Sequence, residues 1–198
     1  MKTVRIFFTG VGGQGNVLAS KLLGEAALLS DIPVVLSEIH GMSQRGGVVE
    51  STAVIGGALS PVIADGEADI LMAFEPLEAL RALRKINGKS IVVVSTAPLP
   101  PSSVAAGKCA YPDVKDIPAF LAGKAARVVS LDARKEAEAA GNPLGANMVM
   151  LGALFATGEL PISKDKLTEA IRKGTKPAFL ESNLACFERG YEAAAGQK

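Results

Sequence analysis

The sequence predicts a three-layer α/β domain with a mostly parallel sheet, and three observations lead to this expectation. Short apolar β-rich runs alternate with amphipathic helical segments along most of the chain. A glycine-rich turn follows the first of these runs, and helical segments close the chain. The length of 198 residues suits one large domain, because domains commonly span about 100 to 200 residues. We therefore expect residues 1–198 to form a single domain.

The first predicted unit is a strand over Val4–Phe8, a helix over Asn16–Leu29 and a strand over Pro33–Ile39. The first run is apolar without alternation, as expected for a strand that is buried on both faces. The helix carries an apolar stripe that should face the sheet, formed by Leu18, Leu22, Ala26 and Leu29. These three elements predict a βαβ unit with a right-handed crossover.

The remaining elements continue this pattern with one interruption. Val48–Ile55 predicts a strand that follows another strand directly, and so breaks the alternation of strands and helices. Further strands are expected at Ala68–Phe74, Ser90–Ser95 and Arg127–Leu131, and helices at Pro76–Ile86, Ala146–Ala156, Lys164–Lys173 and Pro177–Ala193. The pattern therefore predicts a Rossmann-like sheet of about six strands with helices at the C-terminus.

Charge and cysteine content exclude several classes of function. The 21 basic and 20 acidic residues nearly cancel, so the chain lacks the positive field that attracts nucleic acid or anionic membranes. The two cysteines, Cys109 and Cys186, form no paired motif. This argues against a disulfide framework, a zinc site or an iron–sulfur cluster on the chain. Both cysteines are expected to pack as small apolar residues.

Targeting signals are not evident, and a cytoplasmic location is expected. Met1 leads straight into the first β-rich run, without the charged and apolar regions of a signal peptide. The apolar stretch Met148–Ala156 is far shorter than the roughly 20 residues that cross a bilayer. We expect it to be a core helix, although part of it could be an interface with a partner.

The turn after the first strand is the first candidate binding element. It contains Gly10, Gly12, Gly13, Gln14 and Gly15. Glycines here permit a tight turn and let backbone N–H groups approach a phosphate. The alternative is that they serve only close packing of strand against helix. Glu38, near the end of the second strand, is a candidate ligand of a ribose hydroxyl, or simply a loop carboxylate.

A second candidate element is the polar, glycine-rich loop that ends at residue 47. Its candidate cofactor-binding residues are Ser43, Gln44, Arg45, Gly46 and Gly47. Arg45 could hold a carboxylate or phosphate through its planar guanidinium group, or could pair structurally across a turn.

Three more polar residues are possible supporting groups. His40 is the only histidine, so a histidine-rich metal site is excluded, and we expect it at a surface or interface. Asn142 and Asn147 precede or begin an apolar helix, where an asparagine caps the helix or orients a ligand; capping is the expected role. No metal site and no catalytic acid–base set is identified on this chain.

Taken together, these motifs resemble a known family. The turn Gly12–Gly15, the run Met42–Gly47, the segment Ala68–Leu71 and the later Asn142, Asn147 and Leu151–Ala153 are similar to the γ-type domain of 2-oxoacid:ferredoxin oxidoreductases. The similarity covers nearly the whole chain. The motif Met-Ser-Gln-Arg-Gly-Gly and the length of the chain are most similar to those of the small β subunits of the indolepyruvate ferredoxin oxidoreductases.

The resemblance implies a division of labour between subunits. A large α subunit would carry thiamine diphosphate, Mg²⁺ and [4Fe–4S] clusters, and would pass electrons to ferredoxin. The activity implied is oxidative decarboxylation of an aryl pyruvate to an acyl-coenzyme A, which this chain would support but not perform alone. The resulting hypothesis is that Gly12–Gly15 and the loop around Arg45 face the partner or the coenzyme A diphosphate.

Two alternatives remain open on the sequence. The glycine turn and Glu38 would also suit a free-standing NAD(P)-dependent oxidoreductase, although no catalytic acid or base is evident. The same turn would suit a non-catalytic nucleotide-binding or regulatory module.

Overall fold

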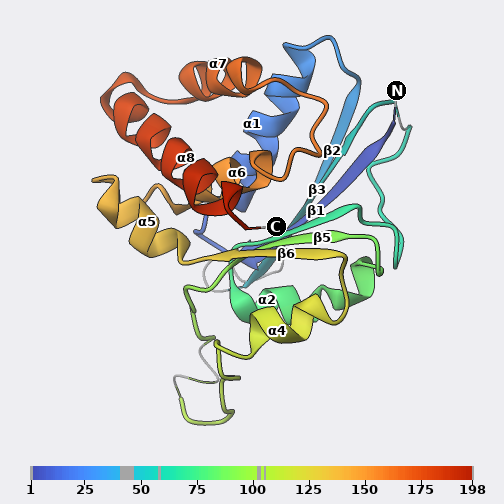
Figure 1. The fold of residues 1–198 in the computed structure, drawn as a ribbon, viewed down its shortest axis with the longest axis vertical. Coiled ribbons are helices and arrows are strands. Elements are labelled where there is room, and N and C mark those ends of the chain that lie inside the picture. The colour runs from blue at the N-terminus through green and yellow to red at the C-terminus, as the bar shows by residue number, and fades with distance from the viewer. Residues whose placement is uncertain (1, 41–46, 58, 102–103, 105, 198) are drawn as a thin grey trace.

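Six strands form one sheet in the part of the chain that the computed structural model describes, which is residues 2–40, 47–57, 59–101, 104 and 106–197. Their spatial order is β2-β3-β1-β4-β5-β6. Helices cover both faces of the sheet (Figure 1). The predicted α/β class is confirmed. The strands are β1 (Val4–Val11), β2 (Val34–His40), β3 (Val48–Ile55), β4 (Ile70–Ala73), β5 (Ile91–Ser95) and β6 (Arg127–Leu131).

The position of β3 corrects one expectation. β1, β4, β5 and β6 pair in parallel, whereas β3 lies antiparallel between β1 and β2. Strands β1 and β2 therefore run in the same direction but are not neighbours, so the predicted βαβ unit is split. The central residues of β3 are buried, with Ala53 and Ile55 fully so. A strand this apolar gains most from neighbours on both sides, which the place between β1 and β2 supplies.

The helices divide into two layers. One face of the sheet carries α1 (Asn16–Leu28), α5 (Ala133–Ala139), α6 (Ala146–Phe155), α7 (Lys164–Gly174) and α8 (Leu180–Ala195), and the other carries α2 (Pro76–Arg81) and α4 (Ile117–Ala122). Short 3-10 turns lie at Leu83–Lys85 and Pro177–Phe179. In β1 the side chains of Ile6 and Phe8 face the larger layer, and Phe7 faces the smaller one.

Helix α6 is the centre of the larger layer. Residues 148–151, 153 and 154 are at most 1% exposed, so the apolar stretch is core, as expected. Helices α6 and α8 approach each other through bare backbone: a Cβ on Gly190 would overlap the carbonyl oxygen of Val149, and one on Gly152 would overlap that of Phe187. Glycine at both positions is what permits this contact.

Two side-chain expectations are corrected. Leu18 is 40% exposed rather than part of the stripe on α1 that faces the sheet, because the buried face of the helix is formed largely by small residues and by Leu22 and Leu23. Cys186 is buried as expected, but Cys109 is exposed. Among the described residues, no helix combines the length and the apolar character needed to cross a membrane.

The outer edge of β6 is closed by a residue near the end of the chain. The side-chain amide of Gln197 accepts a hydrogen bond from the Ser130 N–H at 3.0 Å and donates one to the Ser130 carbonyl at 3.0 Å. Arg127, on the same strand, donates to the Gln197 carbonyl oxygen. Gln197 thus occupies backbone groups that would otherwise be free at this edge.

Candidate functional site

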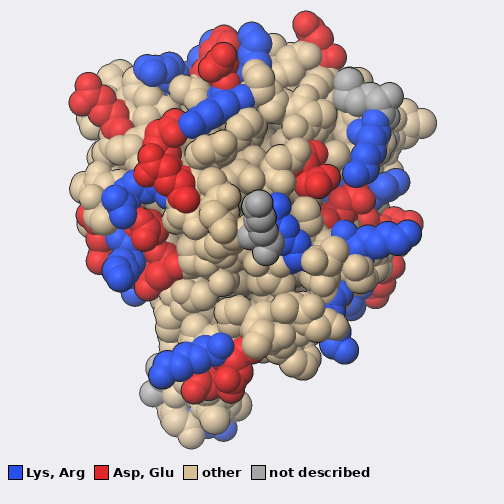
Figure 2. Space-filling view, viewed as in Figure 1, with Lys and Arg blue, Asp and Glu red and all other residues tan. Residues whose placement is uncertain are grey.

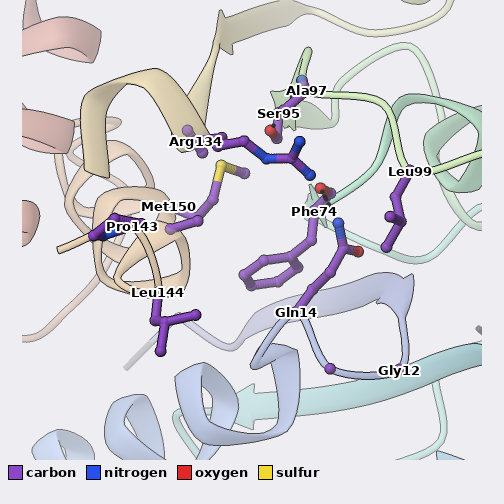
Figure 3. Close-up of a pocket in the computed structure, with 13 residues that line it drawn as sticks. Gly12, Gln14, Phe74, Ser95, Ala97, Leu99, Arg134, Pro143, Leu144 and Met150 are labelled. Atoms are coloured by element: carbon purple, nitrogen blue, oxygen red, sulfur yellow. Dashed lines mark hydrogen bonds between the residues drawn. The ribbon is translucent and has the colours of Figure 1, made fainter. Parts of the chain in front are cut away.

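A pocket of about 270 Å³ lies at the carboxyl ends of the parallel strands. The turn after β1, the residue after β4, the end of β5 and the start of α5 all line it (Figure 3). The chain crosses from β1 to α1 on one face of the sheet and from β4 to α2 on the other. The pocket therefore sits at a topological switch point, where open α/β sheets bind ligands.

The glycine turn forms one wall of this pocket through Gly12, Gly13 and Gln14. The side chain of Gln14 is occupied structurally: its Oε1 accepts from the Val11 N–H at 2.8 Å, and its Nε2 donates to the Phe74 carbonyl at 3.0 Å. Figure 3 shows Gln14 beside Phe74 at the pocket wall. Gln14 thus joins the ends of β1 and β4, and only the second N–H of its Nε2 group is left without a described acceptor.

The backbone of the turn has some capacity for an anion. The Gly12 N–H donates to the Gly47 carbonyl at 2.9 Å, and the Gln14 N–H donates to Val11 at 3.1 Å. Within the described residues, the N–H groups of Gly13 and Gly15 have no hydrogen-bond acceptor. Gly13 has a φ of 99°, which favours glycine. Of Gly13 and Gly15, only Gly13 lines the pocket, so the turn offers a pocket ligand fewer donors than a complete phosphate cradle.

Two of the glycines are explained by packing. Gly15 has a φ of 78°, and a Cβ there would lie 2.7 Å from Nδ2 of Asn147. A Cβ on Gly10 would lie 2.9 Å from Oε1 of Gln14. At these positions the absence of a side chain serves close contact within the fold. Among these glycines, only Gly12 and Gly13 line the pocket, whereas Gly10 lies in β1 and Gly15 precedes α1, so the binding and packing interpretations apply to different glycines.

Among the described residues that line the pocket, Arg134 is the only charged one, and sequence reasoning missed it. It lies in the first turn of α5, directly after β6, and Figure 3 shows its guanidinium group reaching toward Ser95 and Gln14. It forms no ion pair with the carboxylates of the described residues. An arginine held at the carboxyl edge of a parallel sheet suits a carboxylate or phosphate. The position of Arg134 shortly after a predicted strand could have indicated a residue at the carboxyl edge of the sheet.

A buried carboxylate supports the opposite wall. Glu75 is 1% exposed and caps α2 by accepting from the Glu78 N–H at 3.0 Å. Its other oxygen accepts from the Leu99 N–H at 3.1 Å and from the hydroxyl of Tyr111. Burial, followed by the hydrogen bond to Glu75, raises the pKa of Tyr111. Because Leu99 lines the pocket, this carboxylate fixes part of the pocket wall.

Glu78, one turn further along α2, is a second buried acid. Its Oε1 pairs with Arg81 at 2.6 Å, while its Oε2 has no hydrogen-bond partner. Burial raises the pKa of Glu78, and the positive charge of Arg81 opposes that shift.

Other candidate residues lie away from the pocket. Glu38 pairs with Lys21 at 3.3 Å on β2, and two strand spacings, about 10 Å, separate β2 from β1 because β3 intervenes. This placement does not match the ribose ligand of a dinucleotide site, in which the second strand adjoins the first. Gly47 meets the glycine turn through its carbonyl. Ser43, Gln44, Arg45 and Gly46, and the side chain of His40, lie outside what the structure describes.

The two asparagines do not cap α6, contrary to expectation. The N-cap is Gly145, without a side-chain hydrogen bond. Asn142 donates to Oδ1 of Asn183 at 2.8 Å and accepts from the Leu144 N–H at 3.2 Å, which fixes the loop between α5 and α6 against α8. Asn147 bonds locally to the Met148 N–H at 3.1 Å. Both asparagines line a second, neighbouring groove rather than the pocket.

Metal ligation has little support in this chain. Within the described ranges, no group of three or more His, Cys, Asp or Glu side chains is arranged to hold a metal ion. The full sequence has two cysteines, whereas a [4Fe–4S] cluster typically uses four thiolates. These residues do not fit such a cluster.

Comparison with known proteins agrees on one family. Residues 5–193 match the family described as pyruvate ferredoxin/flavodoxin oxidoreductase. The chain is 43% identical over 190 residues to the indolepyruvate oxidoreductase subunit IorB of Methanothermobacter thermautotrophicus, covering 96% of this chain and 97% of that protein. It is 28% identical to the ketoisovalerate oxidoreductase subunit VorA of the same organism, covering 96% of this chain but 36% of that one.

Among solved structures, a similar fold occurs in the gamma subunit of a keto/oxoacid ferredoxin oxidoreductase from Geobacter sulfurreducens PCA. The TM-score is 0.70, the identity is 25%, and the match covers 96% of this chain and 98% of that chain.

Proposed function

The chain belongs to the pyruvate ferredoxin/flavodoxin oxidoreductase family, and from this premise we propose that it is the small subunit of an indolepyruvate or aryl pyruvate ferredoxin oxidoreductase. The observation that carries the proposal is the 43% identity to an indolepyruvate oxidoreductase subunit over nearly the full length of both chains. The described residues that line the pocket include no catalytic acid–base pair, which favours a subunit role over an independent enzyme.

The reaction supported by the whole complex is oxidative decarboxylation. The 2-oxoacid loses its carboxylate as CO₂, its acyl group joins the sulfur of coenzyme A as the thiol releases its proton, and two electrons pass to ferredoxin. In this proposal, thiamine diphosphate, Mg²⁺ and [4Fe–4S] clusters belong to the large α subunit, and the two cysteines of this chain, too few for the four thiolates of a [4Fe–4S] cluster, support that division for the clusters. We expect the complex in the cytoplasm, where an exposed free thiol such as Cys109 stays reduced.

The pocket gives this chain a specific role, which is to hold the diphosphate of coenzyme A. Arg134 supplies a guanidinium group without a competing carboxylate on the pocket wall. Gly13 lines the same pocket and has a free N–H among the described residues. A volume of about 270 Å³ suits one part of coenzyme A rather than the whole molecule. The remaining part, with its thiol, would extend toward the partner.

The test is steady-state kinetics of the reconstituted complex with the variants Arg134→Ala and Arg134→Lys. Loss of a charge-assisted bond to phosphate should raise the KM for coenzyme A by about ten- to a hundredfold in Arg134→Ala. The lysine variant keeps the charge but loses the planar fork, so its KM should be intermediate. The KM for the 2-oxoacid should be unchanged, because that substrate meets the thiamine on the partner.

Lys135→Ala is the matched control, since Lys135 is an exposed cation on the same helical turn that does not line the pocket. An unchanged KM for coenzyme A in Arg134→Ala would remove the assigned role of the pocket. The subunit assignment itself fails if the wild-type complex does not reduce ferredoxin with an aryl pyruvate. Tight binding of NADH by the isolated chain would instead favour a free-standing dinucleotide enzyme.

A further inference from the structure

Next to the pocket lies an open groove of about 290 Å³ whose lining is mostly apolar. It runs between the first turns of α1, the loop before α6 and the connection from α7 to α8. Leu18, Leu144 and Phe179 line it and are 40%, 89% and 53% exposed. Among the described residues in its lining, Lys176 is the only charged one.

The most exposed of these side chains are held outward by ordered contacts. The loop that carries Leu144 is fixed by the hydrogen bonds of Asn142 and by Gly145, where a Cβ would overlap the sulfur of Cys186. Phe179 ends a 3-10 turn in which its N–H donates to Lys176 at 2.9 Å. Large apolar side chains presented on fixed backbone are typical anchors of protein interfaces, because little conformational entropy is lost on binding.

The surrounding surface has a different character. The outer sides of α5, α7 and α8 carry linked ion pairs, including Lys164 with Glu188 at 2.6 Å and Arg189 with Glu136 at 2.6 Å. Figure 2 shows charged side chains of both signs gathered over this part of the molecule. The described lining of the groove carries less charge than the outer sides of these helices, and depletion of charge is usual in the core of an interface.

We propose that this groove, with Leu144 and Phe179 as its anchors, is the docking site for an apolar segment of the large subunit. The inference rests on the proposed function, in which the thiol of coenzyme A leaves the pocket toward that subunit. Leu144 lines both the groove and the pocket, so a partner seated in the groove lies at the mouth of the pocket. In the VorA relative, the matched segment is 36% of one longer chain, so the rest of that subunit is covalently joined to it.

The test is the affinity of this chain for the purified large subunit, measured by isothermal titration calorimetry. Leu144→Asp and Phe179→Asp should each raise the Kd at least tenfold, as expected for anchor residues at an interface. Phe120→Asp is the matched control: Phe120 is 52% exposed, but it lies on α4 on the other face of the sheet. Its Kd should remain within twofold of wild type. Thermal unfolding of each isolated variant checks that folding is intact.

The outcomes separate the two proposals. Unchanged Kd values for both groove variants, or an equal loss in Phe120→Asp, would overturn the docking site while leaving the subunit assignment in place. Self-association of the isolated chain that is lost only in the groove variants would assign the groove to a second copy instead, and would also overturn it. A wild-type chain that does not bind the large subunit at all would refute the proposed function.

Discussion

Removing the hydroxyl of Tyr111 tests how much its hydrogen bond to Glu75 stabilises the fold at the pocket wall. This hydroxyl is one of three donors to the carboxylate of Glu75, beside the N–H groups of Glu78 and Leu99. Tyr111→Phe removes this donor and leaves the ring in place. A hydrogen bond to a charged group contributes about 1.5–3 kcal/mol, and Glu75 is too buried for water to replace the lost donor. We expect the free energy of unfolding to fall by that amount.

The assay is urea unfolding of the isolated chain. With an m-value of about 2 kcal/mol/M, the loss corresponds to a fall of about 1 M in the unfolding midpoint. Tyr191→Phe is the matched control, because the hydroxyl of Tyr191 makes no hydrogen bond to the described residues and its ring is also half-buried. Its midpoint should change little.

The pH dependence gives a second, independent readout. The pKa of Tyr111 is raised in the folded state, first by burial and then by Glu75. Its contribution is therefore complete below the unfolded pKa of about 10 and is lost as pH rises further. The stability gap between wild type and Tyr111→Phe should be constant from pH 7 to 9, then shrink by about 1.4 kcal/mol per pH unit above 10. A gap that is negligible at pH 7, or unchanged at pH 11, would refute the reasoning.

Three further predictions concern other parts of the molecule. Gly190→Ala should lower stability by more than about 4 kcal/mol, because the new Cβ meets the backbone of Val149, and circular dichroism of the purified variant will show whether it folds. In native protein a thiol reagent should modify only Cys109, since burial shields Cys186 and raises its pKa; mass spectrometry before and after unfolding checks this. As pH rises from 4.5 to 7, the free energy of unfolding of Glu78→Gln should increase relative to that of wild type. The reason is that the raised pKa of Glu78 stabilises the folded wild type only while the carboxyl is protonated, at low pH; urea unfolding across this range measures the difference.

The local elements were largely predictable from the sequence. The bounds of β3 and β6 match their predicted ranges, and helices α1 and α6 each end one residue before the expected position. Helices α4 and α5 were missed. α5 consists mainly of alanine and charged residues and buries only Ala133 and Ala137, so it shows no stripe of large apolar residues. α4 is six residues long with a proline in its first turn, too short for a periodic signal.

What could not be predicted was which strands become neighbours. The existence of β3 was readable, but its pairing between β1 and β2 depends on contacts remote in sequence. That pairing is what moves Glu38 away from the glycine turn. Arg134 was missed for a related reason, because its role appears only when β6 is placed beside β5 and the turn after β1.

The contact of Gln197 with β6 bears on edge-to-edge strand pairing between copies of this protein. Fibres grow from open sheets by joining strand to strand, and continuous growth needs two available borders on every molecule. Here one border is obstructed at Ser130 by the chain's own tail, and β2 stands at the other. Strand pairing by another copy at Ser130 would therefore first have to displace the side chain of Gln197.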